Sequence, residues 1–174
     1  LLLATPALAD FPATVTDHIL PGYAALAQTT QALSDAAAQS CKPEDIRPAY
    51  QTAFDAWMGV QHLRFGPIEQ GGLGLSIAYW PDPKGSGTRA QMALLKGDPA
   101  QLEPAAFAQQ SVAARGFFAL ERLLYPSADL PADPCALLRA TSLDLAATAK
   151  KIDAAWVDSY AQTVITAGEA GTTT

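Results

Sequence analysis

The side chains best suited to chemistry lie in segment 115–124, where Glu121 stands within a run of apolar residues. A period near 3.5 places Glu121 on an apolar helix seam beside Phe117 and Leu124. A carboxylate buried there needs a cation, a metal or a proton, because burying an unpaired charge costs several kcal/mol. Phe118 cannot bind a metal, whereas a histidine there would place an imidazole and a carboxylate on one helix turn. Glu121 is therefore either a metal ligand or the structural partner of an arginine.

A second candidate group, His62 and Arg64, closes a predicted helix just before Gly66-Pro67, which is a helix stop. Positive charge suits this place because the helix dipole favours cations at a C-terminus. The helix end alone explains both residues, and ligand binding is the alternative role. His18 is isolated in the sequence and is expected to be a partly exposed helix residue.

The chain has two cysteines, Cys41 and Cys135. In an oxidising compartment such a pair indicates a disulfide. Closing a loop this long would stabilise the fold by about 4–5 kcal/mol. Two thiols with no further cysteine or histidine at ligand spacing do not form a zinc site.

Four segments carry apolar residues with a helical period and are predicted to be helices of more than four turns. They span about residues 15–36, 43–60, 104–124 and 134–156. Pro21 falls within the first and should kink it or delay its start. No segment alternates with period two for long enough to form a convincing strand. We therefore predict an all-α protein, a four-helix bundle with up-down-up-down order.

A long glycine-rich connection, from Gly66 to about Leu102, joins the second and third predicted helices. One short helical stretch is expected near residues 89–96. Structureless connections of this length are uncommon in compact domains and often carry function. Tyr79 and Trp80 are expected to pack over one end of the bundle, which makes Trp80 a candidate ligand contact.

The direction of the third helix decides which of these groups can meet. In an up-down-up-down bundle Cys41 and Cys135 share one end, where a disulfide needs Cα atoms within about 7 Å. Glu121 then lies near that end, about 25–30 Å from Arg64. If the third helix instead runs parallel to the second, Glu121 and Arg64 converge and the disulfide is lost. We favour the disulfide, because two cysteines in an exported domain have few other uses.

The favoured arrangement supplies other partners for Glu121. Arg47 and Arg139 lie near the starts of the second and fourth predicted helices. Both are candidate ion-pair partners and candidate binding residues.

Composition excludes some partners. The chain has 174 residues, of which 49% are apolar and 16% charged, as expected for one folded domain. Its net charge of −6 repels nucleic acid and anionic membrane, so neither is expected to bind.

The two ends of the sequence suggest where the protein acts. Residues 1–9 resemble the tail of a secretory signal, with an apolar run and a small-residue cleavage site, Ala7-x-Ala9, before Asp10. No other stretch approaches the ~20 apolar residues of a membrane span. We therefore expect an exported protein that does not span a membrane. Residues 168–174 look like a linker.

Several blocks together resemble the imelysin-like family of exported bacterial proteins. They are residues 53–57, residues 64–67 and Trp80-Pro81, and the resemblance covers about residues 10–160. The family's GxHxxE motif is matched at Gly116 and Glu121 and departs at Phe118. Family members are typically two four-helix bundles in one chain. The resemblance thus implies that residues 10–167 are the first bundle and that a second bundle is a partner.

The resemblance also suggests functions. The family takes its name from an insulin-cleaving metallopeptidase, and relatives are linked to iron uptake and iron regulation. The departure at Phe118 weighs against a peptidase, which needs a metal held by about three protein ligands. We predict a periplasmic binding or uptake accessory linked to iron or another divalent metal, with Glu121 as the candidate ligand. It would work with a periplasmic or outer-membrane uptake partner. The alternatives are a metallopeptidase and a purely structural interaction domain.

Overall fold

The computed structural model describes residues 10–167, and every regular element within that range is a helix. The predicted all-α class is confirmed. The expected signal remnant, residues 1–9, and the expected linker, residues 168–174, lie outside the described residues. None of the helices in residues 10–167 has both the length and the apolar character needed to cross a membrane.

The first long helix is continuous but changes its winding. α1 (Phe11–Thr14) and α2 (Leu20–Gln39) are joined by a π-helical turn, η1 (Val15–Ile19). Pro21 lies inside this continuous helix, directly after the π-helical turn, whose wider hydrogen-bond spacing accommodates a residue without an N–H group. The chain therefore passes Pro21 without a break, and the first predicted helix begins earlier than its apolar stripe.

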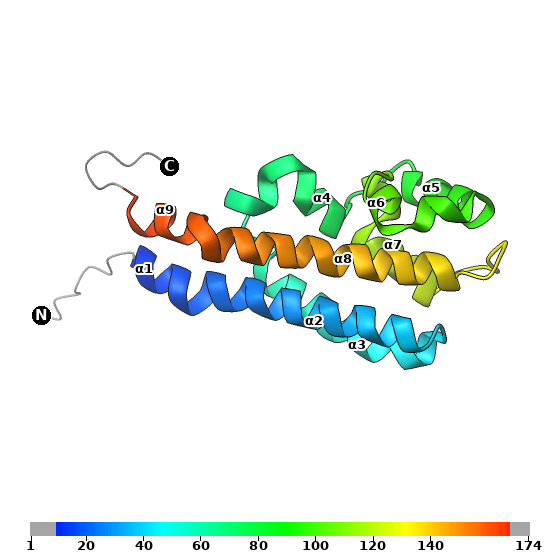
Figure 1. Ribbon diagram of the computed structural model, residues 1–174, viewed down its shortest axis with the longest axis horizontal. Coiled ribbons are helices and arrows are strands. Elements are labelled where there is room, and N and C mark those ends of the chain that lie inside the picture. The colour runs from blue at the N-terminus through cyan, green and yellow to red at the C-terminus, as the bar shows by residue number, and fades with distance from the viewer. Residues whose placement is uncertain (1–9, 168–174) are drawn as a thin grey trace, which may run out of the picture.

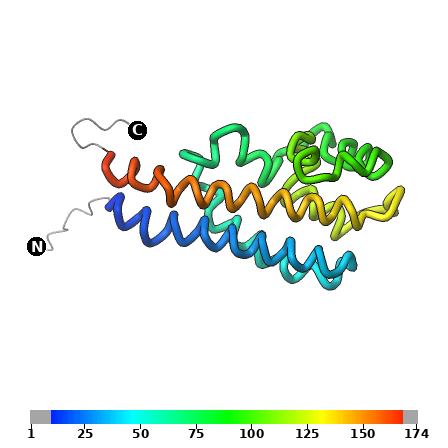
Figure 2. Tube along the Cα trace, in the orientation of Figure 1, coloured from blue at the N-terminus to red at the C-terminus, as the bar shows by residue number. Residues whose placement is uncertain are grey.

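Two further long helices lie beside α2, as Figure 1 shows. They are α3 (Pro43–Val60) and α8 (Cys135–Ala155). A second π-helical turn, η5 (Trp156–Tyr160), carries α8 into α9 (Ala161–Ile165). Figure 2 shows that α1 and α9 meet at one end of the molecule. The apolar faces of these helices form the core, whose largest fully buried side chains include Trp156, Tyr23, Phe107 and Phe117.

The predicted continuous third helix, from Pro104 to Leu124, is wrong. The chain instead forms α6 (Pro104–Phe107), a 3-10 turn η4 (Val112–Ala114) and α7 (Gly116–Leu124). Gly116 has a φ of +74°, which no right-handed helix contains. The helix is therefore interrupted there, and only the α7 portion packs against both α3 and α8.

The connection between α3 and the third segment is largely helical, so its expected lack of structure is wrong. It contains η2 (Gly66–Gly72), α4 (Leu73–Ile77), α5 (Ser86–Lys96) and η3 (Pro99–Leu102). The short helix expected near residues 89–96 corresponds to α5. Figure 1 shows these segments covering one side of the long helices.

The predicted disulfide between Cys41 and Cys135 is confirmed, with Cα atoms 5.3 Å apart. It joins the turn after α2 to the first residue of α8, so α2 runs toward the bond and α8 away from it. Near the start of α3, Arg47 donates two hydrogen bonds to the Leu124 carbonyl oxygen at the end of α7. The C-terminus of α7 therefore also lies toward the disulfide end.

Candidate functional site

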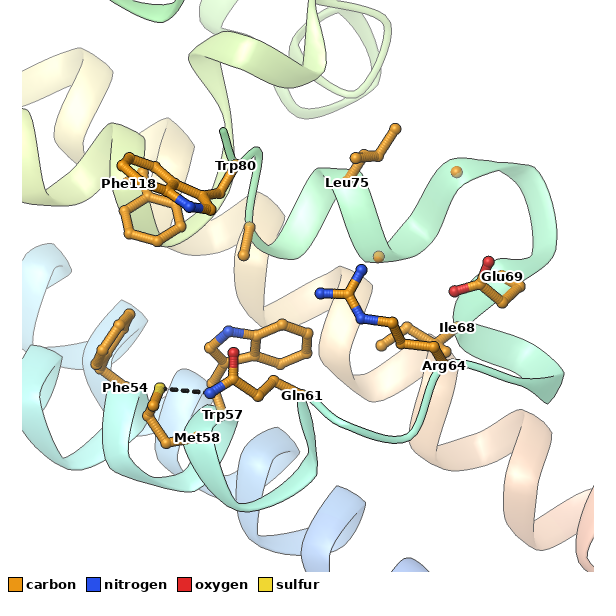
Figure 3. A pocket seen from close by; sticks show the side chains of 13 residues that line it. Phe54, Trp57, Met58, Gln61, Arg64, Ile68, Glu69, Leu75, Trp80 and Phe118 are labelled. Carbon is orange, nitrogen blue, oxygen red and sulfur yellow. Dashed lines mark hydrogen bonds between the residues drawn. The ribbon is translucent and has the colours of Figure 1, made fainter. Parts of the chain in front are cut away.

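A pocket of about 570 Å³ lies beside the C-terminal half of α3, a volume that falls in the usual range for small-ligand sites, roughly 300–1,000 Å³. Figure 3 shows it between α3, the η2–α4 segment and the start of α7. We call it the aromatic pocket. Its lining residues are Phe54, Trp57, Met58, Gln61, Arg64, Ile68, Glu69, Gly72, Gly74, Leu75, Ala78, Trp80 and Phe118.

Aromatic side chains dominate one side of the pocket. The Phe118 ring lies 5.4 Å from the Trp80 ring and 6.2 Å from the Phe54 ring, centroid to centroid. Trp57 is buried at 6% exposure, whereas Trp80 is 70% exposed and presents its indole to solvent. An exposed indole beside other aromatic rings can stack on a planar ligand.

Gly116 fixes the position of Phe118. A Cβ at Gly116 would overlap the carbonyl oxygens of Ser76 and Ile77, at the end of α4. The close approach and the φ of +74° both require glycine. The first turn of α7 thus starts directly against α4, which carries Phe118 to the pocket wall.

Asp82 anchors the segment that carries Trp80. Its carboxylate accepts hydrogen bonds from the backbone N–H groups of Ser86 and Gly87, both at 2.8 Å, and from the Ser86 hydroxyl at 2.6 Å. These hydrogen bonds, with the Ser86 hydroxyl contributing most, lower the pKa of Asp82. The start of α5 is therefore tied to a residue two positions from Trp80.

Two charged side chains, Arg64 and Glu69, reach the pocket from the segment after α3. Figure 3 shows the Arg64 guanidinium directed toward the middle of the pocket and the Glu69 carboxylate at its edge. Within residues 10–167 the Arg64 guanidinium makes no hydrogen bond or ion pair, and it is not within ion-pair distance of Glu69. Its donors are therefore available to a ligand.

The expected burial of Glu121 is wrong. Its side chain is exposed and, within the described residues, forms no ion pair. The buried face of α7 centres on Gly116, Leu120 and Leu123, and Glu121 lies beyond its edge. The Glu121 charge still acts on Tyr50, whose pKa is raised mainly by burial and further by that charge.

Arg47 and Arg139 do not pair with Glu121. Arg139 donates hydrogen bonds to the carbonyl oxygens of Ala37 and Ala38, at 3.0 and 3.2 Å, at the end of α2. Arg47 binds the end of α7 in the same way. Helix C-termini leave carbonyl oxygens without partners, so both arginines serve to close helices.

His62 lies just outside the pocket, and the structure brings it against His18. The two Nε2 atoms are 3.2 Å apart, although 44 residues separate the histidines in the chain. No local signal in the sequence could have predicted this contact, because it depends on how the first long helix, which carries His18 in η1, crosses α3.

Sequence reasoning missed a buried ion pair, Arg115 with Asp144. Arg115 Nε and Nη2 donate to the two carboxylate oxygens at 2.8 and 2.9 Å, and the two side chains are 10% and 8% exposed. The pair fastens the residue before α7 to α8. The available signal was Asp144 itself, a charge between Leu143 and Leu145 in an apolar helix.

The donor set for a bare metal ion is sparse. Among residues 10–167, no group of three or more histidine, cysteine, aspartate or glutamate side chains could hold a metal. The lining of the aromatic pocket, largely aromatic and aliphatic side chains with a few polar groups, is typical of sites for organic ligands.

Comparisons with known proteins place this geometry in context. The sequence profile of the Imelysin family (Peptidase_M75) matches residues 19–173. The crystal structure of an imelysin-like protein from Psychrobacter arcticum 273-4 has a TM-score of 0.80 and 23% sequence identity. The match covers 95% of this chain and 57% of that one, so this chain spans little more than half the length of that protein. No curated protein matches the sequence.

Proposed function

Because this chain belongs to the imelysin family, we propose that it is an exported, periplasmic binding protein that assists the uptake of iron or another metal. Its proposed ligand is a metal in complex with an anionic organic carrier, held in the aromatic pocket. The observation that supports this most is the Arg64 guanidinium, which has no partner among the described residues and points into a pocket with aromatic walls.

The chemistry of the pocket selects this ligand class. A guanidinium binds carboxylate or phenolate oxygens through paired hydrogen bonds and stacks on planar groups. Trp57, Trp80 and Phe118 offer apolar, planar surface next to it. A carrier that already wraps the metal needs no protein donor atoms on the ion, in keeping with the lack of a three-ligand group in residues 10–167.

Export is part of the proposal. The disulfide supports it, because such bonds persist mainly in oxidising compartments. The small-residue pattern Ala7-x-Ala9 supports it at the sequence level. We further propose that residues 10–167 form the first of two bundles and that the protein delivers its ligand to an uptake partner in the periplasm or outer membrane.

The motif position argues against a peptidase. Phe118 stands where the family motif has histidine, and its ring is packed against Trp80 and Phe54. Glu121 belongs to no group of three metal-binding side chains within residues 10–167, so it would ligate a metal only together with donors from outside that range. Peptide hydrolysis that a chelator abolishes would favour the peptidase instead.

Tryptophan fluorescence provides the test, because two of the three tryptophans, Trp57 and Trp80, line the pocket. The protein would be titrated with Fe(III) complexes of catecholate, hydroxamate and citrate carriers, and with free Fe(II) and Fe(III). We expect quenching by at least one complex and weaker binding by Arg64→Gln, about 10- to 100-fold, because a charge-assisted hydrogen bond is lost.

Lys151→Gln is the matched control. Lys151 is exposed on α8 and lies outside the pocket, so the same change of charge should leave affinity unaltered. If no complex quenches the fluorescence, or if the two variants bind equally well, the proposal fails. A purely structural interaction domain would give the first of these results.

A further inference from the structure

The two histidines of the chain, His18 and His62, form a pair on the surface. Their rings are 5.3 Å apart between centroids and inclined by 26°, and their Nε2 atoms approach to 3.2 Å. Both side chains are exposed, so solvent reaches the pair. The two histidines of the sequence therefore direct their Nε2 atoms at one another.

The crossing of the first long helix with α3 builds this pair. His18 lies in the π-helical turn η1, and His62 follows the last residue of α3, Val60, by two positions. One turn after His18, Gly22 faces Val60, and a Cβ at Gly22 would lie 2.5 Å from Val60 Cγ1. The absence of that Cβ lets the helices approach closely, and this closeness sets the distance between the imidazoles.

We propose that His18 and His62 form a two-histidine site for a divalent transition metal ion, preferentially Cu(II). Metal-to-imidazole bonds are about 2.0–2.1 Å, so two nitrogens on adjacent positions of one ion lie about 2.8–3.4 Å apart, from a right angle to a tetrahedral angle at the metal. The observed 3.2 Å falls within this span. With their protons on Nδ1, both Nε2 lone pairs are free to bind the ion in place of the present hydrogen bond.

The site is suited to exchange of its ion. Two protein ligands leave the remaining positions to water, and no third donor completes a metal-binding group among residues 10–167. Cu(II) ranks highest because imidazole sites follow the Irving–Williams order. The site is independent of the proposed pocket function, since neither histidine lines the aromatic pocket.

The test uses the full chain carried on a tag without histidine. Cu(II) would be titrated calorimetrically, and the complex examined by electron paramagnetic resonance. We expect one Cu(II) per chain with two imidazole nitrogens, which can come only from this pair because the chain has no other histidine. His18→Gln and His62→Gln should each weaken binding about 100-fold, because each removes the chelate.

Controls separate this proposal from the others. Arg64→Gln should leave Cu(II) binding unchanged, and His18→Gln should leave carrier binding in the aromatic pocket unchanged. Cu(II) should also raise the melting temperature of the wild type and of neither histidine variant. Cu(II) bound without imidazole nitrogens, or with equal affinity by both single variants and the wild type, overturns the site. Variants that melt lower than the wild type with no metal-dependent shift in any protein would show that the pair is only a hydrogen bond.

Discussion

Replacing Gly116 by alanine should destabilise the fold and displace the wall of the aromatic pocket. Gly116 holds a φ of +74°, which costs an L-residue about 1–2 kcal/mol. The new Cβ would also overlap the carbonyl oxygens of Ser76 and Ile77, which belong to backbone and cannot rotate away. Overpacking of this kind costs about 1–3 kcal/mol.

Together these effects predict a loss of about 2–5 kcal/mol in the free energy of unfolding. At about 2–4 °C per kcal/mol for a domain of this size, a loss of 3 kcal/mol would lower the melting temperature by about 6–12 °C. Because α7 begins at Gly116, Phe118 should move relative to Trp80, and the tryptophan fluorescence of the folded protein should change as well.

Gly59→Ala is the matched control for this change. Gly59 is exposed on α3, and a Cβ there would meet nothing within 4 Å. The same substitution should therefore stabilise the protein by about 0.5–1 kcal/mol, since alanine favours a helix over glycine. Urea unfolding followed by circular dichroism measures both. A Gly116→Ala protein that unfolds at the wild-type midpoint, or later than Gly59→Ala, would refute the reasoning.

Three further predictions concern other parts of the molecule. Arg115→Met should lower the free energy of unfolding by about 3–5 kcal/mol in urea titrations, because Asp144 is left buried and unpaired; adding Asp144→Leu should recover much of the loss. The double variant Cys41→Ser/Cys135→Ser should lose about 2–5 kcal/mol relative to the oxidised protein and should match the reduced wild type. Burial raises the pKa of Asp153 above 3.8, so the folded state favours the protonated carboxyl group. The stability that this protonation contributes is fully present below pH 3.8 and is lost as the pH rises through the folded pKa. Asp153→Asn should therefore melt above the wild type at pH 7, and the difference should shrink toward pH 3.

For each of these three predictions, one result would contradict the physical reason given. An Arg115→Met protein of wild-type stability would mean that the ion pair contributes nothing beyond its desolvation cost. Equal stability of the oxidised and reduced proteins would show that the disulfide contributes nothing to the free energy of unfolding. A stability difference for Asp153→Asn that does not vary with pH would show that Asp153 is not the titrating group.

The long helices were predictable from the sequence because their apolar stripes repeat over many turns. The stripe of α3, from Ile46 to Val60, corresponds to its buried face in the structure. The third helix could not be predicted in the same way, because its interruption at Gly116 depends on carbonyl groups of α4, some 40 residues earlier in the chain. A stripe reports which side of a helix is apolar, but it does not report a contact that forces the helix to stop.

The candidate site was predicted only in part. Arg64 and Trp80 were identified from the sequence and line the pocket, whereas the pairing of Glu121 with an arginine was wrong. Phe117 and Leu124 of the predicted stripe are buried, but the buried face of α7 centres on Gly116, Leu120 and Leu123, and Glu121 lies beyond its edge. The sequence also contained a feature that could have indicated the pocket, namely apolar residues just outside a buried stripe, such as the exposed Met58.

The disulfide has a topological consequence for the pocket. The bond joins residues 94 positions apart and so closes the chain into a covalent ring, from which α2 and α8 leave as two tails. All thirteen residues that line the pocket, from Phe54 to Phe118, belong to the ring. A protease that cuts the exposed segment around Lys84 would open the ring without dividing the molecule, so the nick would appear on a gel only after reduction. A fragment that carries lining residues is therefore released only after two cuts within the ring, or after one cut followed by reduction of the disulfide.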